Sequence, residues 1–179
     1  FKQYLEWHKQ FKNKNHTITF VANQVYEQSK PRNDWFTNTP FLAGLIPLEN
    51  DSFYTINQVK KTKNNNIETL VKHYWILNNF NHLYTNLGND YTRTSVSTDE
   101  KQLLSNGTIN NFNTEGFGNQ LDYQLNDAFI GFEHKFKMGK WINKSGLYVH
   151  NYALSNAQNE SNYKINKTLI EPQWNSEYE

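Results

Sequence analysis

The sequence feature that most constrains the fold is a hairpin with one tight end, which occurs twice. The first copy spans residues 67–94 and reads IETLVKHYWILN-NFN-HLYTNLGNDYTRT. The second spans residues 128–154 and reads AFIGFEHKFKMG-KW-INKSGLYVHNYAL. Each has two strand-like runs of about ten residues around a turn of two to four residues, and long polar stretches separate the hairpins. Short turns at one end and long connections at the other are typical of an up-and-down outer-membrane β-barrel.

The composition argues against an ordinary soluble core. Hydrophobic residues make up 36% of the 179 residues, aromatic residues alone make up 16%, and 28 residues are asparagine. The mean hydropathy is -0.88. A disordered chain would lack the aromatic residues. A wall with one wet face, one lipid face and girdles of Trp and Tyr needs both classes of residue.

Charge and targeting signals narrow the function classes. The 18 basic and 17 acidic residues give a net charge of +1 without a basic block, which disfavours nucleic-acid binding. The chain has no cysteine, a composition compatible with an outer membrane. No apolar run approaches the roughly 20 residues of a membrane helix. Because no signal peptide is evident and the chain begins at Phe1 without Met, we expect an internal fragment of an exported protein.

Alternating patterns predict about seven strands of an antiparallel sheet. They cover residues 1–11, 16–26, 67–77, 82–92, 128–138, 144–154 and 169–179, and residues 53–62 are expected to extend one of them above the membrane. Long polar connections are expected over residues 28–52, 95–127 and 155–167. Runs of this length match the roughly 9 to 11 residues of a tilted membrane strand. The run 67–77 is apolar on both faces near its end, so the pattern does not assign its lipid face.

Five aromatic residues fall at or beside the short turns. They are Trp7, Phe11, Trp75, Phe80 and Trp141. Aromatic side chains gather where a membrane meets water. The sequence therefore predicts an interfacial girdle at the short-turn end.

Two segments carry a family resemblance. VKHYWILNNFNHLYTNLGNDY and FIGFEHKFKMGKWINKSGLYVHNYAL resemble barrel strands of TonB-dependent receptors and are most similar to the outer-membrane β-barrel family of Bacteroidota. The resemblance covers residues 1–179 and rests on the hairpins, not on a catalytic signature. It implies an all-β, antiparallel up-and-down transmembrane β-barrel, of which this chain is one part of a wall of about 22 strands. It also implies a Gram-negative, Bacteroidota-like outer membrane.

The same resemblance implies a function and partners. In such receptors a plug precedes the barrel, and import of a siderophore, glycan or peptide is coupled to a TonB-type protein. The chain has no recognisable plug or TonB box, so coupling is expected through a plug domain outside it. Outer-membrane lipid is the second expected partner. The apolar run FLAGLIPL, residues 41–48, is a candidate contact for a surface lipoprotein, with packing against neighbouring loops as the alternative.

Aromatic residues in the expected extracellular loops are candidate contacts for a sugar or peptide ligand. They are Trp35, Phe36, Tyr54, Phe112, Phe117, Tyr123 and Tyr163. Their residue type is the basis of this prediction, because aromatic and Asn side chains suit both ligand classes. No cofactor is expected.

No catalytic constellation is evident, and we expect no enzyme activity. Glu133 shares a predicted face with Lys135 and Lys137, which indicates a charge ladder in the lumen, with contact to substrate as the alternative. His73 and His82 flank one tight turn and are expected to be neighbours across the hairpin. Imidazole is a common metal ligand, but no Cys or His-x-His spacing supports a site, so no metal is expected.

Three other functions stay open at this stage. A passive porin-like channel would differ from a receptor only in sequence outside this chain. A soluble β-sandwich carbohydrate-binding module predicts turn signals about every 8 to 12 residues at both ends of its strands, whereas the connections here alternate short and long. A secreted β-enzyme would need an acid–base pair or a nucleophile motif, and neither is evident.

Overall fold

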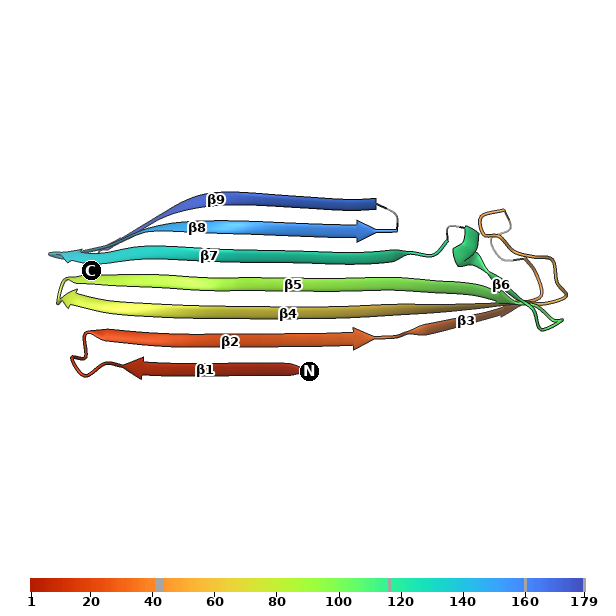
Figure 1. The fold of residues 1–179 in the computed structure, drawn as a ribbon, viewed down its shortest axis with the longest axis horizontal. Coiled ribbons are helices and arrows are strands. Elements are labelled where there is room, and N and C mark those ends of the chain that lie inside the picture. Colours follow the sequence, from red (N-terminus) through yellow and green to blue (C-terminus); the bar gives the residue numbers. More distant parts are fainter. Residues whose placement is uncertain (41–43, 116, 160, 179) are drawn as a thin grey trace.

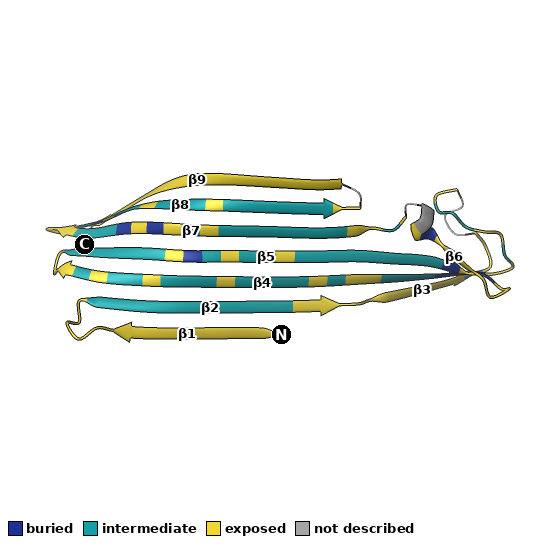
Figure 2. Ribbon diagram, in the orientation of Figure 1, coloured by how far each residue is buried: buried dark blue, intermediate teal, exposed yellow. Residues whose placement is uncertain are grey.

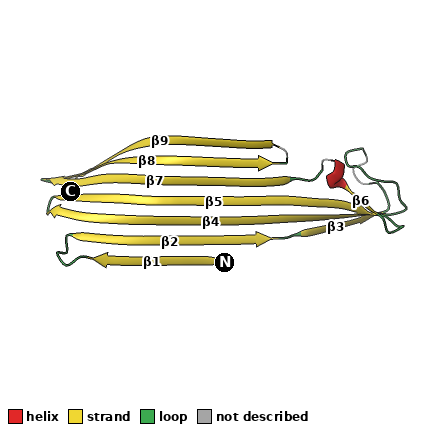
Figure 3. Cartoon of the chain, viewed as in Figure 1, coloured by secondary structure: helices red, strands yellow, loops and turns green. Residues whose placement is uncertain are grey.

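The computed structural model describes residues 1–40, 44–115, 117–159 and 161–178, which form one antiparallel β-sheet (Figure 1, Figure 3). The sheet has nine strands in the order β1-β2-β4-β5-β7-β8-β9, while β3 pairs with β4 and β6 pairs with β5. Neighbouring strands on the main path are antiparallel throughout. The predicted all-β, antiparallel up-and-down class is therefore confirmed, as are its seven main strands.

The strands differ widely in length. They are β1 (Lys2–Gln10), β2 (His16–Ser29), β3 (Arg32–Thr37), β4 (Tyr54–Asn78), β5 (Asn81–Leu103), β6 (Ile109–Asn111), β7 (Gln120–Met138), β8 (Trp141–Gln158) and β9 (Ser161–Tyr178), with a short 3-10 helix η1 (Phe112–Glu115). The longest, β4, has 25 residues. At about 3.3 Å per residue it spans roughly 80 Å.

Three tight turns lie at one end of the sheet, at the left of Figure 1, and connect β1 to β2, β4 to β5 and β7 to β8. In the first, Lys14 has a φ of 56° and its amide donates to the Phe11 carbonyl at 2.9 Å. In the second, the Phe80 amide donates to the Asn78 side chain at 2.9 Å. In the third, Gly139 has a φ of 60°, a conformation that costs glycine little. The predicted short connections are confirmed.

At the opposite end of the sheet, the strands extend into the segments that were predicted to be long connections. Within residues 95–127, β5 continues to Leu103 and β7 begins at Gln120. Within residues 155–167, β8 and β9 are separated by two residues, and Gln158 pairs with Ser161. Residues 28–52 contain the end of β2 and all of β3. The prediction was wrong because ladder hydrogen bonds use the backbone, so polar side chains do not end a strand.

The sheet is a single layer over most of its length (Figure 2). Substantial contacts between the described elements join strands that are neighbours in the sheet, apart from those of η1 with β5. Buried hydrophobic residues among those described are Tyr54, Ile56, Leu104 and Phe112, all at the end opposite the tight turns. Soluble domains bury one face of a sheet against a second layer. No described element supplies that layer here.

One face of the sheet is apolar. Because alternate residues of a strand point to opposite faces, residues paired in register share a face. One such row, with a residue from each main strand, contains Trp7, Phe20, Val71, Leu87, Ile130, Val149 and Ile170. We call this side the apolar face. From the row of Ile67 and Tyr91 to the tight turns, Lys9 is the only Asp, Glu, Lys or Arg among its paired, described residues.

The other side, which we call the charged face, carries most of the charge in the same part of the sheet. Its members include Glu68, Lys72, Asp90, Asp127, Glu133, Lys135, Lys144 and Glu171. The register also settles the two faces of residues 67–77. Val71 and Trp75 point to the apolar face, and Glu68 and Lys72 point to the charged face.

Candidate functional site

The connections that follow β3 and β5 fold into a cap on the outer ends of β4 and β5, at the right of Figure 1. We use the name cap for residues 44–53 and 104–115. The side chains of Tyr54, Ile56 and Phe112 are 6%, 3% and 1% exposed. These buried side chains come from β4 and η1, and Leu104, from the connection, is 9% exposed. The cap and the outer end of β4 therefore share the small hydrophobic core of the described chain.

The buried side-chain amide of Gln102 fixes the connection between β3 and β4 to the sheet. Gln102, near the end of β5, is 0% exposed. Its Oε1 accepts from the Glu49 amide at 2.9 Å, and its Nε2 donates to the Glu49 carbonyl at 2.8 Å. The Asn110 side chain donates to the Pro47 carbonyl at 2.7 Å. A buried polar group left without a partner costs about 1–3 kcal/mol, so these bonds hold residues 47–49 in place.

A carboxylate joins the two connections of the cap. Asp51 accepts hydrogen bonds from the Ser105 hydroxyl at 2.6 Å and from the Ser105 amide at 2.5 Å. The Ser52 amide donates to the same carboxylate at 2.7 Å. The bonds from Ser105 hold the pKa of Asp51 below its usual value. The hydrogen bonds to the ionised Asp51 carboxylate are therefore fully present at neutral pH. They weaken as the pH falls through the lowered pKa of Asp51.

The apolar run predicted to contact a partner lies at the edge of this cap. Residues 41–43 of the run lie outside the described residues. Leu45 is 69% exposed, and the Leu48 amide donates to the Ile46 carbonyl at 2.8 Å. Contact with a lipoprotein stays a prediction.

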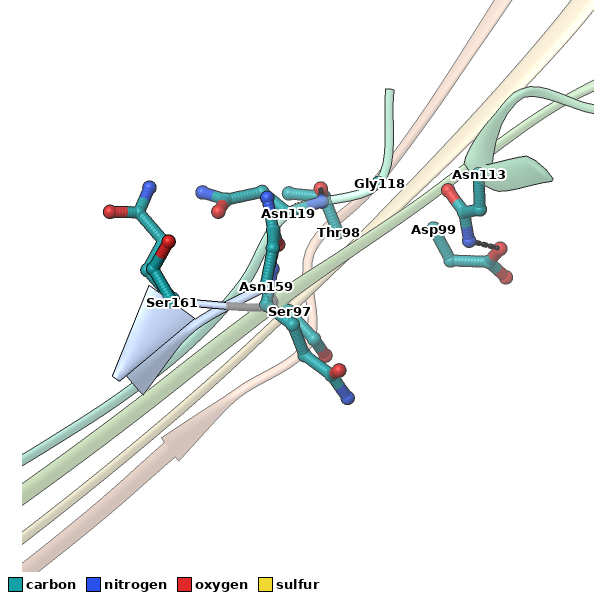
Figure 4. A pocket seen from close by; sticks show the side chains of 10 residues that line it. Ser97, Thr98, Asp99, Asn113, Gly118, Asn119, Asn159 and Ser161 are labelled. Carbon is teal, nitrogen blue, oxygen red and sulfur yellow. Dashed lines mark hydrogen bonds between the residues drawn. The ribbon is translucent and has the colours of Figure 1, made fainter. Parts of the chain in front are cut away.

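An open groove lies beside the cap, where β5, β7 and the β8–β9 turn meet (Figure 4). Its volume is about 890 Å³. Its lining includes Ser97, Thr98, Asp99, Asn113, Asn119 and Asn159. In Figure 4 the Asn113 amide reaches from η1 to the Asp99 carboxylate, to which it donates at 3.0 Å.

Hydrogen bonds between the strand ends preform the groove. The Asn119 backbone amide donates to the Thr98 hydroxyl at 3.0 Å, and the Thr98 backbone amide donates to the Asn119 backbone carbonyl at 2.9 Å. The Gln120 backbone amide donates to the Asn159 side-chain oxygen, and the Asn159 backbone amide donates to the Gln120 backbone carbonyl, each at 2.9 Å. Side-chain amides and hydroxyls both donate and accept hydrogen bonds. The groove can therefore pair with a ligand rich in hydroxyl or amide groups.

The seven aromatic residues predicted to contact ligand are dispersed, and none of them lines this groove. Trp35 and Phe36 lie in β3, Tyr54 in β4, Phe112 in η1, Phe117 in the connection to β7, Tyr123 in β7 and Tyr163 in β9. Their placement in loops was therefore wrong for Trp35, Phe36, Tyr123 and Tyr163, whereas Tyr54 lies in the strand extension that was predicted over residues 53–62. Tyr54 and Phe112 are buried in the small hydrophobic core that the cap shares with β4. Phe36 is 71% exposed and stacks on Phe53, with ring centroids 5.3 Å apart.

The sequence did not identify the groove residues, because their polar side chains were interpreted as typical of loops. Asn113, Asn119 and Asn159 belong to polar stretches in which strands were not expected. They meet because β5 pairs with β7 and β7 pairs with β8, which brings three strand ends together. Clusters of Asn, Ser and Thr at the predicted loop end were the available signal.

The predicted girdle residues gather at the tight-turn end. Trp7, Phe11, Trp75, Phe80 and Trp141 lie within four residues of a tight turn, and their exposed fractions range from 38% to 59%. Trp75 stacks on the His16 ring at a centroid distance of 5.0 Å. Their position and exposure are those that an interfacial girdle requires. Contact with a membrane stays a prediction.

The charged face holds a hydrogen-bonded cluster around Glu133, which is 7% exposed. Its carboxylate pairs with the Lys144 ammonium and accepts from the Tyr148 hydroxyl. The Asn86 side chain donates to the Tyr148 hydroxyl at 2.7 Å. Lys144 also lies over the Tyr84 ring, 5.6 Å from its centroid. Glu133 therefore links β7 to β8, and its cation partner lies across the strand pair rather than along β7.

The prediction that His73 and His82 are neighbours across the hairpin was wrong. His73 pairs with Thr85 and His82 with Ile76, which places the two rings on opposite faces. His73 instead stacks on His16, with centroids 5.4 Å apart. Within the described ranges, no group of three or more His, Cys, Asp or Glu is arranged to hold a metal ion.

No protein-family model matches the chain, and no curated protein matches it either. No helix in the described part of the chain has the length and hydropathy of a membrane span. The sheet, its two faces and the cap carry the functional proposal.

Proposed function

We propose that this chain is a wall segment of an outer-membrane β-barrel receptor of the TonB-dependent type, which imports a nutrient. The single observation that carries the proposal is a one-layer antiparallel sheet with an apolar row across all seven main strands and charges on the opposite face. An apolar face that contacts lipid needs no second protein layer to cover it. A charged face that lines a water-filled lumen stays hydrated.

Closure of the wall follows from backbone chemistry. An unpaired backbone group in lipid costs several kcal/mol, so only a closed barrel can cross with strands. The path of described strands ends at β1 and β9, and every described residue of these two strands is exposed. Pairing of β1 and β9 with further strands of a larger barrel would supply hydrogen-bond partners for the backbone groups at both edges.

Ligand capture is supported by the strand lengths and the cap. A crossing needs about 9 to 11 residues, whereas β4 has 25 and β5 has 23. The extra residues raise the cap and the groove well above the membrane. A preformed groove of amides and hydroxyls fits a glycan or peptide better than it fits free passage of solutes. Energy coupling would act through a plug that these strands surround.

The test uses the full-length protein in isolated outer membranes. Mild denaturing electrophoresis with and without boiling is expected to show a heat-dependent mobility shift in the detergent-extracted fraction, since a closed barrel resists detergent. Recovery in the soluble fraction without any shift would contradict the proposal. In planar bilayers we expect low conductance, because a plug closes the lumen. A steady open conductance would favour a passive channel instead.

A further inference from the structure

The apolar face changes character on the side away from the tight turns. Beyond the row of Ile67 and Tyr91, the next rows bring four cations to this face: Lys61, Lys63, Arg93 and Lys164. We call them the cationic belt. Asp122 is the one carboxylate among the paired residues of these rows, which also contain Gln28, Ser97 and Gln120. The belt therefore carries a net positive charge.

The belt coincides with hollows in the surface. One groove of about 420 Å³ is lined by Gln24, Tyr26, Lys63, Asn65, Arg93 and Ser95. All six residues belong to rows of the apolar face. A second groove, of about 300 Å³, includes Lys164 and Gln124. Each hollow thus combines a cation with side-chain amides, which are hydrogen-bond donors.

The cations are arranged to receive an anion. Arg93 Nη2 is 2.8 Å from the Asp122 carboxylate, which also accepts from Gln124 at 2.9 Å. This pair fixes the guanidinium and leaves other N–H groups of Arg93 available. Neither Lys63 nor Lys164 forms an ion pair with any residue that the structure describes.

We propose that the cationic belt binds the phosphate groups of lipids that carry a net negative charge, in the leaflet on the cap side. The inference rests on the proposed function, because it requires the apolar face to contact lipid. Arg93 lies in the row next to that of Ile67 and Tyr91, and Lys63 lies one row beyond it. In the other direction, the fully apolar row of Val71 lies two rows from that of Ile67. An acyl chain can therefore lie along β4 while its phosphate occupies the groove. A soluble anion would gain nothing from that continuity.

The test compares lipid binding by two double variants of the full-length protein. Lys63→Gln with Lys164→Gln removes two belt cations, one in β4 and one in β9. Lys72→Gln with Lys167→Gln removes two exposed lysines from the charged face of the same strands. The probe is dioleoyl phosphatidic acid titrated onto detergent-solubilised protein and followed by native mass spectrometry. Phosphatidylcholine and inorganic phosphate are the reference ligands.

The belt variant is expected to bind phosphatidic acid roughly 25-fold more weakly, since each cation near an anionic membrane contributes about fivefold. The charged-face variant is expected to stay within about twofold of the parent. Lys63→Arg with Lys164→Arg should retain binding, which separates loss of charge from misfolding. Unchanged affinity in the belt variant would overturn the proposal, as would equal binding of phosphatidylcholine or full displacement by inorganic phosphate. Retention of the heat-dependent shift in these samples keeps such a failure distinct from failure of the barrel itself.

Discussion

In the proposed barrel, replacement of Ile170 by Arg is expected to cost roughly 2–4 kcal/mol of stability, as a cation does at a lipid-facing strand position near the bilayer midplane. Ile170 is 67% exposed and belongs to the fully apolar row. Leu169, the next residue, is 42% exposed and pairs with His150 on the charged face. Leu169→Arg is therefore expected to cost less than about 1 kcal/mol, because in the proposed barrel the charged face lines a hydrated lumen.

Urea unfolding of both full-length variants in phospholipid vesicles measures this difference. The two sites are adjacent in β9 and carry isomeric side chains, so residue size and distance from the strand ends are matched. Equal free energies of unfolding would contradict the assignment of the faces. A larger loss for Leu169→Arg would reverse it.

The second large effect is expected from Gly131→Ala, which should cost about 3 kcal/mol through overpacking and lost hydrogen bonds. A Cβ at Gly131 would lie well inside van der Waals contact with the Tyr148 ring. The ring cannot turn away freely, because its hydroxyl bonds to Glu133 and Asn86. Phe129 covers Gly88 in the same way one row further along the charged face.

A double-mutant cycle isolates this contact. In a Tyr148→Ala background the cost of Gly131→Ala should vanish, because the ring that the new methyl group meets is absent. In a Tyr148→Phe background the cost should fall part of the way, because a ring without the hydroxyl has no bonds to Glu133 and Asn86 to lose when it turns away. Additive losses in the Ala background would show that Gly131 is needed for another reason, such as backbone geometry.

The tight turns and the strand directions could be predicted from the sequence because they depend on local signals. The alternation of residues 128–138 and the turn at Gly139 suffice to define the hairpin of β7 and β8. The faces of residues 67–77 could not be predicted, since both registers there contain apolar residues. They become distinct only across strands, where Val71 lies between Phe20 and Leu87, and Glu68 lies between Asn23 and Asp90.

The cap and the groove could not be predicted, because their contacts are long-range. Gln102 binds a backbone 53 residues away in sequence, and Gln120 meets Asn159 across 39 residues. Nothing in the neighbourhood of Phe112 distinguishes a buried ring from an exposed one. The outer strand ends were missed for a related reason: their side chains are polar on both faces, so periodicity fades although the backbone ladder continues.

A cysteine-accessibility scan of β9 tests the central claim most directly, and the absence of cysteine from the chain suits it. Single Cys variants at residues 167–173 of the full-length protein would be treated in intact outer membranes with a water-soluble maleimide. Labelling is expected at Lys167, Leu169, Glu171 and Gln173, which lie on the charged face, and protection at Thr168, Ile170 and Pro172, which lie on the apolar face. Uniform labelling at all seven positions would mean water on both faces and would contradict the membrane wall.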